Sequence, residues 1–449
     1  MFRFHLIVCT QQKPEGVSSC FAAGSLAVLE RLDQELQARG LAREVQLTTS
    51  GCLGLCEEGP ILVVYPDGVW YRRVQIADVA EIVESHLGGG RPVERLIWTD
   101  ADARQAMSLE HAERFRAAAA ARDKAGTLPD RLNQMIRGYM PSRSIFTALE
   151  LDLFSAVGNG ATAEEAAVAI HADARATAML LNALVALGLL EKDGNIFRDT
   201  LETARYFTRG SRDNHRDGLL HIANIWHRWS GLTEAVRTGA SIPIERASSP
   251  EWTEQFIASM QYNASERAPA VVEAIGTAGV RRILDLGGGS GIYSIAFAKA
   301  SSGLRCEIFD LPEVVPLTAG YIERAGVASQ VAIRAGDMLQ DDLGSGFDLA
   351  LLNAICHMFS AEQNLQLFRR IRRALVSGGR LVVQDFILNP DKSGPLHAAL
   401  FTLNMLVGTA AGACYSEPEF TSWMTSAGFT HVRRINLPGP SDLIVGHAP

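Results

Sequence analysis

The sequence lacks the positive charge and the dense cysteine pattern that mark several large classes of protein. Its 449 residues carry 42 lysines and arginines against 50 aspartates and glutamates, which gives a formal net charge of −8. Nucleic-acid binding depends on a basic surface that neutralises phosphates, so this balance argues against a nucleic-acid partner. Seven cysteines in so long a chain do not suggest a disulfide framework, which belongs to small proteins of oxidising compartments.

Long hydrophobic segments are also missing. The first ten residues, MFRFHLIVCT, lack the apolar core and the cleavage site of a secretory signal. The longest weakly polar run, residues 398–414, contains Thr402, Asn404 and Gly408 and falls short of the roughly 20 apolar residues that span a bilayer. We therefore expect a cytoplasmic protein without a membrane segment, and we interpret this run as a buried helix that continues into a loop.

The length predicts more than one domain, because a single core rarely holds so many residues. Residues 1–95 alternate short apolar runs with helical patterns in the order β-α-β-β-α, which is typical of a small α/β domain. Residues 96–130 contain an alanine-rich helix of mixed charge with little apolar face, which suits a connector.

The rest of the chain changes pattern once more. Residues 131–265 are mainly helical, with a hairpin turn at Asp193-Gly194, and helices closed by a short hairpin indicate a winged helix. In residues 266–449, apolar strands alternate with helices, as in a Rossmann-like, doubly wound parallel sheet. The overall prediction is an α/β protein with a helical middle domain.

A glycine loop follows the first strand of the last region, in RRILDLGGGSG at residues 281–291. Such a turn brings backbone N–H groups close to a nucleotide-like ligand at the carboxyl ends of the strands. The dinucleotide fingerprint needs a glycine at position 292, where this chain has Ile292, so the loop weighs against a dehydrogenase. Two acids follow later strands: Asp310 ends CEIFD, where a carboxylate can accept both hydroxyls of a ribose, and Asp337 follows AIRAG.

Together, the glycine loop, FDLPEV and GDM resemble the S-adenosylmethionine site of class I methyltransferases, specifically the O-methyltransferase family of plant phenolic and bacterial polyketide enzymes. This resemblance implies that two glycines approach the methionine portion of the cofactor, one acid binds the ribose, and an Asp-Met pair binds the adenine. The residues concerned, in that order, are Gly287 and Gly289, then Asp310, then Asp337 with Met338. The same resemblance adds Asp285, Leu311 and Asn353 to the expected cofactor contacts.

The expected catalytic base is His357, which follows the strand FDLALLN. It matches the histidine that the family uses to remove a proton from the substrate hydroxyl, and imidazole titrates in the right range for that task. Plant members flank this histidine with two acids. The first corresponds to Asp385, one methylene shorter than the family's glutamate, and the second falls near Cys414, so it is missing unless Glu417 or Glu419 reaches the site.

The helical region resembles the family's dimerisation domain, which implies a homodimer whose partner contributes to the active site. Its presumed recognition helix, residues 174–190, carries one arginine and no lysine, so it is interpreted as a packing helix rather than a DNA reader. Trp226, Trp229 and Met260 are candidates for the wall of an aromatic substrate pocket, and a place in the core explains them equally well.

Four cysteines lie in the first 56 residues, spaced Cys9-x10-Cys20-x31-Cys52-x3-Cys56. Structural zinc sites usually use tight cysteine pairs, whereas thiolates from separate loops can ligate an iron–sulfur cluster. The arrangement, with CLGLCEEGPILVVYPDGVWY, resembles thioredoxin-like 2Fe-2S ferredoxins across the N-terminal domain, which implies that these cysteines hold a 2Fe-2S cluster. Gly51 and Gly54 would let the backbone turn around it, and a zinc site or a dithiol switch remains open.

The sequence thus predicts an S-adenosylmethionine-dependent O-methyltransferase that acts on a small aromatic or polyketide-like hydroxyl compound and carries a fused ferredoxin. The ferredoxin implies electron transfer or redox control, and with it an electron-transfer partner. One alternative keeps the methyltransferase fold for a redox reaction without methylation. Another is a redox-sensing regulator that binds DNA.

Overall fold

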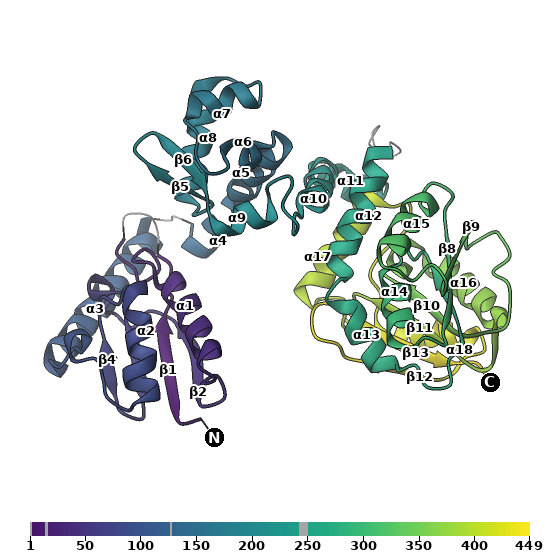
Figure 1. Ribbon diagram of the computed structural model, residues 1–449, viewed down its shortest axis with the longest axis horizontal. Coiled ribbons are helices and arrows are strands. Elements are labelled where there is room, and N and C mark those ends of the chain that lie inside the picture. The colour runs from purple at the N-terminus through teal and green to yellow at the C-terminus, as the bar shows by residue number, and fades with distance from the viewer. Residues whose placement is uncertain (1, 14–16, 126–127, 242–249) are drawn as a thin grey trace. The chain divides into compact units, whose positions relative to one another are not determined.

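The computed structural model describes residues 2–13, 17–125, 128–241 and 250–449, and the chain divides into two compact units, Met1–Arg137 and Gly138–Pro449 (Figure 1). Among the described residues, no single helix is both long and apolar enough to cross a membrane; α7 (Ala163–Ala169) and α8 (Ala174–Ala186) pass that test only together, and they are bent by 111°.

The first unit is built on a four-stranded sheet in the order β2-β1-β3-β4. Strand β1 runs parallel to β2 and antiparallel to β3, and β3 pairs with β4 in antiparallel fashion. The elements are β1 (Phe4–Cys9), α1 (Ser25–Ala38), β2 (Val45–Ser50), the short 3-10 helix η1 (Cys56–Glu58), β3 (Leu62–Tyr65), β4 (Val69–Tyr71), α2 (Val79–Glu81), η3 (Ile82–Gly88), α3 (Ala101–Ala125) and α4 (Asp130–Arg137).

Alternating side chains of β1 and β3 fill two separate cores, because successive residues of a strand point to opposite faces of the sheet. Leu6 and Leu62 pack with α1, α2 and η3 on one face. Ile7, Cys9 and Val63 point to the other face. The core on that face also includes Trp98, which precedes α3, and Met107, which lies in α3. The sheet is therefore covered on both faces.

Helix α3 lies in the segment that the sequence suggests as a connector, but it packs with the first unit. Its hydroxyl Ser108 Oγ donates a hydrogen bond to the carbonyl oxygen of Leu53 at 3.3 Å. Gly54, with φ of 80°, approaches so closely that an added Cβ would lie 2.8 Å from Ser108 Oγ. Helix α3 docks through polar side chains and one methionine, which is why its apolar face is small.

The helical part of the second unit carries a two-stranded hairpin, whose register pairs Asp193 with Ile196, so that Gly194 and Asn195 form the turn. The turn is thus one residue beyond the expected Asp193-Gly194. The elements are α5 (Tyr139–Glu150), α6 (Leu153–Val157), α7, α8, β5 (Leu190–Asp193), β6 (Ile196–Asp199), α9 (Leu201–Tyr206), α10 (Arg216–Trp229), α11 (Leu232–Thr238) and α12 (Pro250–Ala264).

A seven-stranded sheet in the order β12-β13-β11-β10-β7-β8-β9 forms the rest of the second unit. Its strands are parallel except β13, which runs antiparallel to both neighbours. The elements are α13 (Arg267–Ile275), β7 (Arg282–Leu286), α14 (Ile292–Ala300), β8 (Arg305–Asp310), α15 (Val315–Arg324), β9 (Val331–Ala335), β10 (Phe347–Asn353), η5 (Cys356–Met358), α16 (Ala361–Ala374), β11 (Leu375–Asp385), α17 (Leu396–Gly408), α18 (Glu417–Ser426), β12 (Thr430–Ile435) and β13 (Asp442–His447).

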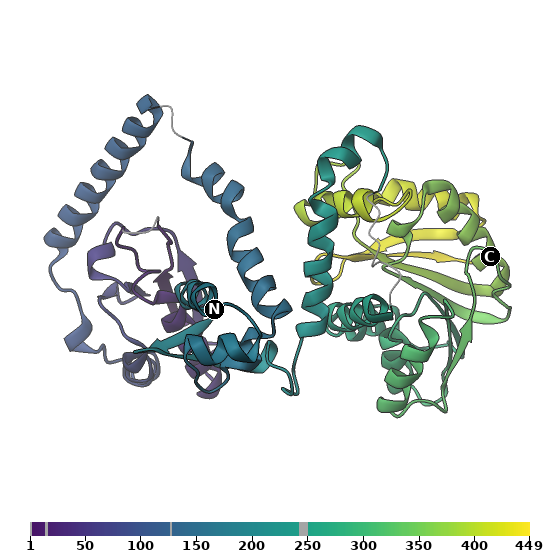
Figure 2. The same ribbon diagram turned by 90° about the horizontal axis from the view of Figure 1, so that it is seen from above.

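Helices cover both faces of this sheet (Figure 2). One face packs on α13, α14 and α15, and the other on α16 and α18. The expected doubly wound, Rossmann-like sheet is confirmed. Because β7 is flanked by β8 on one side and β10 on the other, the chain order reverses between β7 and β10, and open sheets of this type bind ligands at that reversal, beyond the carboxyl ends of the strands.

Candidate active site and cysteine site

The glycine loop leaves β7 at this reversal and leads into α14. Gly287 and Gly289 have φ of 66° and 58°, a region that residues with a Cβ seldom adopt. At Gly287 an added Cβ would also collide with the side chain of Ile355 beyond β10, and at Gly289 it would lie 3.6 Å from Ile257 of α12. The loop is thus held between two isoleucines that sequence reasoning did not identify.

Asp310, at the end of β8, holds the glycine loop in place. Its Oδ2 accepts a hydrogen bond from the N–H of Gly289 at 2.7 Å, and its Oδ1 accepts one from the N–H of Leu311 at 2.8 Å. Burial raises the pKa of this carboxyl, and these N–H donors oppose the rise. The carboxylate is therefore fixed at the edge of the crevice, beside the loop.

Two buried side chains at the same edge have unpartnered polar atoms. Neither the oxygen nor the nitrogen of the Asn353 side chain has a hydrogen-bond partner within the described residues, and the same holds for Oδ1 of Asp285. Oδ2 of Asp285 accepts from Ser294 Oγ at 2.7 Å, and burial raises the pKa of Asp285 to about 6. Buried polar atoms normally have partners, so these residues fit a polar ligand such as the amino-acid end of S-adenosylmethionine.

The remaining expected cofactor residues lie along β8 and β9. Met338 is half-buried, and its Cε would lie 3.1 Å from a Cβ at Gly287. Asp337, after β9, accepts hydrogen bonds from the N–H of Leu339 and the side chain of Gln340, both at 2.8 Å. Leu311 is 43% exposed. An exposed apolar side chain beside Asp310 offers a surface for a ligand.

His357 and Asp385 form a buried pair at the ends of β10 and β11. His357 Nδ1 lies 2.7 Å from Asp385 Oδ1, and the N–H of His357 donates to Oδ2 at 3.1 Å. An aspartate at this distance accepts the Nδ1 proton, so Nε2 keeps its lone pair and can accept a proton from another molecule. The two residues are 28 positions apart in the chain, and the segment that joins them contains α16 and β11, as a parallel βαβ unit requires.

The two glutamates considered as a second acid have other partners. Glu419 Oε2 accepts hydrogen bonds from the N–H and the hydroxyl of Ser416 and pairs with Lys392. Glu417 faces Arg434 at 3.8 Å. Among the described residues, the carboxylate that hydrogen-bonds His357 is Asp385.

Aromatic rings surround His357 and were not identified from the sequence. Phe401 lies edge-on to the imidazole at 4.9 Å, and Phe386 lies at 6.0 Å. His397 stacks in the same group, and the Arg267 guanidinium lies 5.9 Å from the Phe386 ring. Burial lowers the pKa of His397, and the charge of Arg267 adds to the effect. An aromatic wall next to the imidazole suits a flat aromatic substrate.

The tryptophans proposed for the substrate pocket have different neighbours. Trp229 Nε1 donates to Asn404 Oδ1 on α17 at 3.0 Å, whereas Trp226 lies edge-on to Phe146 of α5 at 6.3 Å. Met260 is partly buried in α12. Trp229 thus packs against a helix that also carries Phe401, and Trp226 packs within the helical part.

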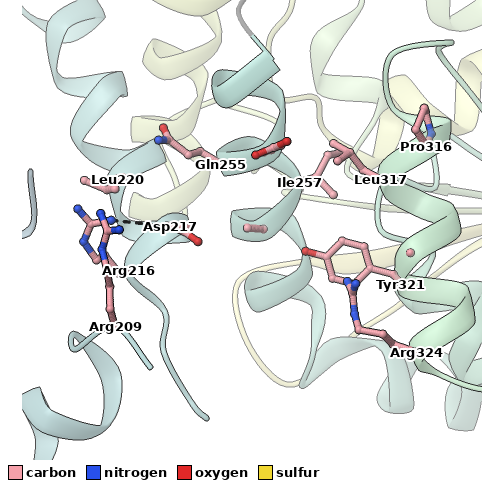
Figure 3. A pocket seen from close by; sticks show the side chains of 13 residues that line it. Arg209, Arg216, Asp217, Leu220, Gln255, Ile257, Pro316, Leu317, Tyr321 and Arg324 are labelled. Atoms are coloured by element: carbon pink, nitrogen blue, oxygen red, sulfur yellow. Dashed lines mark ion pairs between the residues drawn. The ribbon is translucent and has the colours of Figure 1, made fainter. Parts of the chain in front are cut away.

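A cavity of about 750 Å³ lies among α10, α12 and α15 (Figure 3). Ile257, which approaches Gly289, is part of its wall, so the cavity adjoins the glycine loop. Two of its arginines share one carboxylate, because Asp152 pairs with Arg209 at 2.7 Å and with Arg216 at 3.3 Å.

In the first unit, the four N-terminal cysteines come from three separate segments. Cys9 ends β1, Cys20 lies in the turn before α1, and the third segment carries Cys52 after β2 and Cys56 at the start of η1. The Sγ atoms of Cys52 and Cys56 are 3.4 Å apart. Cys20 interacts with both Cys9 and Cys56. The structure therefore brings the four thiols into one group.

The surroundings of these thiols favour thiolates at two positions. A hydrogen bond from Cys20, followed by one from Lys13, lowers the pKa of Cys56 to about 4, and Cys20 likewise lowers the pKa of Cys9 to about 6. Lys13 Nζ lies 3.0 Å from Cys56 Sγ. The N–H of Gly54 donates to Cys52 Sγ at 3.3 Å. Thiolates are the form that binds metals, so the group suits a thiophilic metal.

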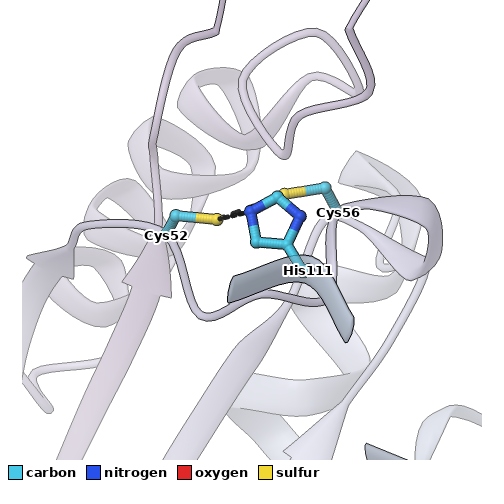
Figure 4. A group of neighbouring side chains, drawn as sticks. All are labelled: Cys52, Cys56 and His111. Atoms are coloured by element: carbon cyan, nitrogen blue, oxygen red, sulfur yellow. Dashed lines mark hydrogen bonds between the residues drawn. The ribbon is translucent and has the colours of Figure 1, made fainter. Parts of the chain in front are cut away.

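His111 of α3 also reaches the cysteine group, with its imidazole directed toward Cys52 and Cys56 (Figure 4). Its Nε2 lies 3.5 Å from Cys52 Sγ, and the three donor atoms all lie within 4.8 Å of one another. No sequence motif links His111 to cysteines more than 50 residues earlier, so only the packing of α3 identifies it.

Two domain families match this chain, each over a different segment of the second unit or of the residues just before it. Residues 133–209 match the O-methyltransferase dimerisation domain, and residues 229–430 match the O-methyltransferase domain. These ranges contain the helical part and most of the seven-stranded sheet. They define an O-methyltransferase fold.

Individual relatives agree with this class. The chain is 33% identical to 3-hydroxy-5-methyl-1-naphthoate 3-O-methyltransferase of Streptomyces sahachiroi over 71% of its own length and 95% of the relative. It is 30% identical to the tetracenomycin polyketide synthesis 8-O-methyl transferase TcmO of Streptomyces glaucescens, over 72% of this chain and 97% of that one. Human N-acetylserotonin methyltransferase, solved in complex with SAM, superimposes with a TM-score of 0.63 at 26% identity, over 70% of this chain and 96% of that one.

The chain belongs to the S-adenosylmethionine-dependent O-methyltransferase family. It is an O-methyltransferase. The two Streptomyces relatives are named for a naphthoate substrate and for tetracenomycin polyketide synthesis.

Proposed function

We propose that this enzyme methylates a hydroxyl group on a small aromatic or polyketide-like compound and that His357 acts as its general base. The observation that carries the proposal is the buried His357–Asp385 pair with Nε2 as the acceptor. A phenol-like hydroxyl has to lose its proton as the new bond forms, and a positioned imidazole can accept that proton. The aromatic rings of Phe386 and Phe401 beside it fit a flat substrate.

S-adenosylmethionine, when bound, supplies a sulfonium methyl group for in-line transfer to the substrate oxygen. Asp310 and Asn353 would hold its ribose and its amino-acid portion, since one is fixed beside the glycine loop and the other has unpartnered polar atoms. His357 Nε2 accepts the hydroxyl proton, and Asp385 stabilises the imidazolium that results.

The test is the substitution His357→Ala. We expect the methylation rate to fall on the order of a hundredfold or more while the affinity for S-adenosylmethionine stays nearly unchanged, because a general base acts in the transition state. Single-turnover rates and calorimetric titration measure the two quantities separately. Turnover at the wild-type level would instead favour catalysis by proximity alone.

We further propose that the enzyme is a homodimer. The dimerisation-domain match supports it, and so do the exposed apolar side chains at the start of α5, where Tyr139 and Met140 are 54% and 50% exposed. Neighbouring exposed apolar side chains usually mark an interaction surface.

For the first unit we propose a thioredoxin-like 2Fe-2S ferredoxin with Cys9, Cys20, Cys52 and Cys56 as ligands. The strand order β2-β1-β3-β4, with α1 connecting the parallel pair β1 and β2, supports the fold. The donor chemistry supports the cluster, because four thiols gather in one group, of which Cys9 and Cys20 lie in an apolar core with Trp98 and Met107. A 2Fe-2S cluster supplies one-electron transfer, which here would serve redox control or an electron-transfer partner.

A redox reaction in the methyltransferase pocket is the second candidate, and the observation that favours it is the group of four cysteines in the same chain. Turnover of the anaerobically purified enzyme with and without a chemical reductant separates the two. Methylation that needs no reductant supports the transferase, and turnover that consumes electrons supports the alternative.

A further inference from the structure

Helix α3 brings a fifth potential ligand to the cysteine group. His111 lies one turn after Ser108 on the face that packs against the cysteine loop, because Ser108 Oγ donates to the carbonyl of Leu53. On the same face, Arg114 lies 3.9 Å from Glu57. The imidazole is therefore positioned by contacts on either side of it.

The imidazole faces the sulfur atoms through Nε2. Lys13 Nζ lies 3.0 Å from both His111 Nε2 and Cys56 Sγ, and an ammonium group can only donate hydrogen bonds, so both atoms accept from it. His111 Nε2 and Cys56 Sγ therefore share one cation, which shows that both can face the same positively charged partner.

The distances let either Cys52 or His111 share a metal ion with Cys56. Bonds of about 2.3 Å to sulfur and about 2.0–2.1 Å to imidazole nitrogen place two tetrahedral ligands roughly 3.6 to 3.8 Å apart. Cys52 Sγ is 3.4 Å from Cys56 Sγ, and His111 Nε2, 3.5 Å from Cys52 Sγ, also lies within 4.8 Å of Cys56 Sγ. Cys52 is also the exposed member of the group, whereas Cys9, Cys20 and Cys56 are buried.

We infer that His111 is a reserve ligand of the cysteine site, able to take the metal coordination position of Cys52. The inference rests on the proposed 2Fe-2S cluster, in which Cys52 is the ligand that His111 can replace. Imidazole is an established ligand of iron in 2Fe-2S centres, where it raises the reduction potential relative to thiolate. The exposed thiol could then be lost without loss of the cluster.

The experiment compares Cys52→Ala with the double variant Cys52→Ala/His111→Ala in the full-length protein, each prepared anaerobically. We expect the single variant to keep about two irons and two sulfides per chain with a changed visible spectrum and a higher potential. Pulsed electron paramagnetic resonance of its reduced form should show strong coupling to a nitrogen nucleus. The double variant should lose most of its iron and the nitrogen coupling.

Cys9→Ala is the matched control. Cys9 contacts Cys20 and lies 3.4 Å from the carbonyl of Gly51, with no imidazole beside it among the described residues, so its loss should abolish the cluster. Retention of iron by both Cys52 variants alike, or loss from both alike, overturns the reserve-ligand inference. A wild-type protein that binds no cluster overturns the proposed ferredoxin itself, and the wild-type iron content distinguishes the two failures.

Discussion

At the carboxyl ends of the second unit's sheet, Asp310 and Asp385 already accept hydrogen bonds from the chain's own donors, whereas in the first unit four sulfur atoms face one another. The methyltransferase site is thus fixed before any ligand arrives, and the unpartnered atoms of Asn353 and Asp285 await a polar molecule. The cysteine site brings together four thiols, which stabilise one another little unless a metal binds them.

This difference shows how each site depends on its ligand. Fixed acids and backbone N–H groups cost little reorganisation when a cofactor binds, which is a general condition for efficient catalysis. Clustered thiols must lose protons when a metal binds, so metal binding and local folding are linked. We therefore expect the first unit to be more sensitive to loss of one of its buried ligands, Cys9, Cys20 or Cys56.

The largest expected effect is at the cysteine site. Cys56→Ser should bleach or shift the visible absorbance of the anaerobically purified protein, because oxygen matches iron less well than thiolate. The control Cys306→Ser changes a buried cysteine of the second unit and should keep the colour. Affinity for S-adenosylmethionine should stay the same in both. Colourless wild-type protein with stoichiometric zinc would refute the ferredoxin proposal.

The next effect tests how His357 is oriented. Asp385→Asn should lower the methylation rate by about a hundredfold, because an amide does not stabilise the imidazolium and can reverse the tautomer. Asp385→Glu keeps the carboxylate and restores the residue expected from plant members, so it should retain much more activity. Methylation rates of both variants, measured over a range of pH, should show this difference. Equal rates in the two variants would show that the carboxylate is not needed.

A smaller effect is expected at the ribose position. Asp310→Ala should weaken binding of S-adenosylmethionine by about 1.5 to 3 kcal/mol, roughly 10- to 150-fold, because charge-assisted hydrogen bonds are lost. Isothermal calorimetry measures it. Unchanged affinity would reject the assignment of Asp310 to the cofactor.

The smallest effect concerns His221 on α10, whose Nδ1 is buried without a partner among the described residues. Burial lowers the pKa of His221 to about 4, and the charge of Arg228 adds to this. The unfolded chain therefore binds more protons below pH 6.5, and stability is lost as the pH falls from 6.5 toward 4. Between pH 7 and pH 5, wild-type protein should lose about 1 to 2 kcal/mol more unfolding free energy than His221→Phe. Urea denaturation at each pH measures the unfolding free energy. An equal change between pH 7 and pH 5 in the two proteins would contradict this prediction.

Local signals predicted the strands, the glycine loop and the acids that follow strand ends, because each depends on residues adjacent in sequence. The positions of Ile257 and Ile355 against the glycine loop could not be predicted, since they come from elements brought together only by packing. Helix α3 is the clearest difference. Its weak apolar periodicity suggested a connector, but its polar side chains dock on the cysteine loop, and hydrophobic patterns carry no signal for such contacts.

The close approach of Gly54 to Ser108 bears on how such a chain could have been assembled during evolution. The two residues share a space that does not admit even one additional methyl group without displacement, so a larger residue at either position requires a change at the other. We therefore expect the cysteine loop and α3 to be inherited together. If a gene fusion joined a ferredoxin to a methyltransferase, the fusion boundary would lie after α3. A boundary at the glycine run, residues 88–90, would separate the cysteine loop from the helix that packs against it.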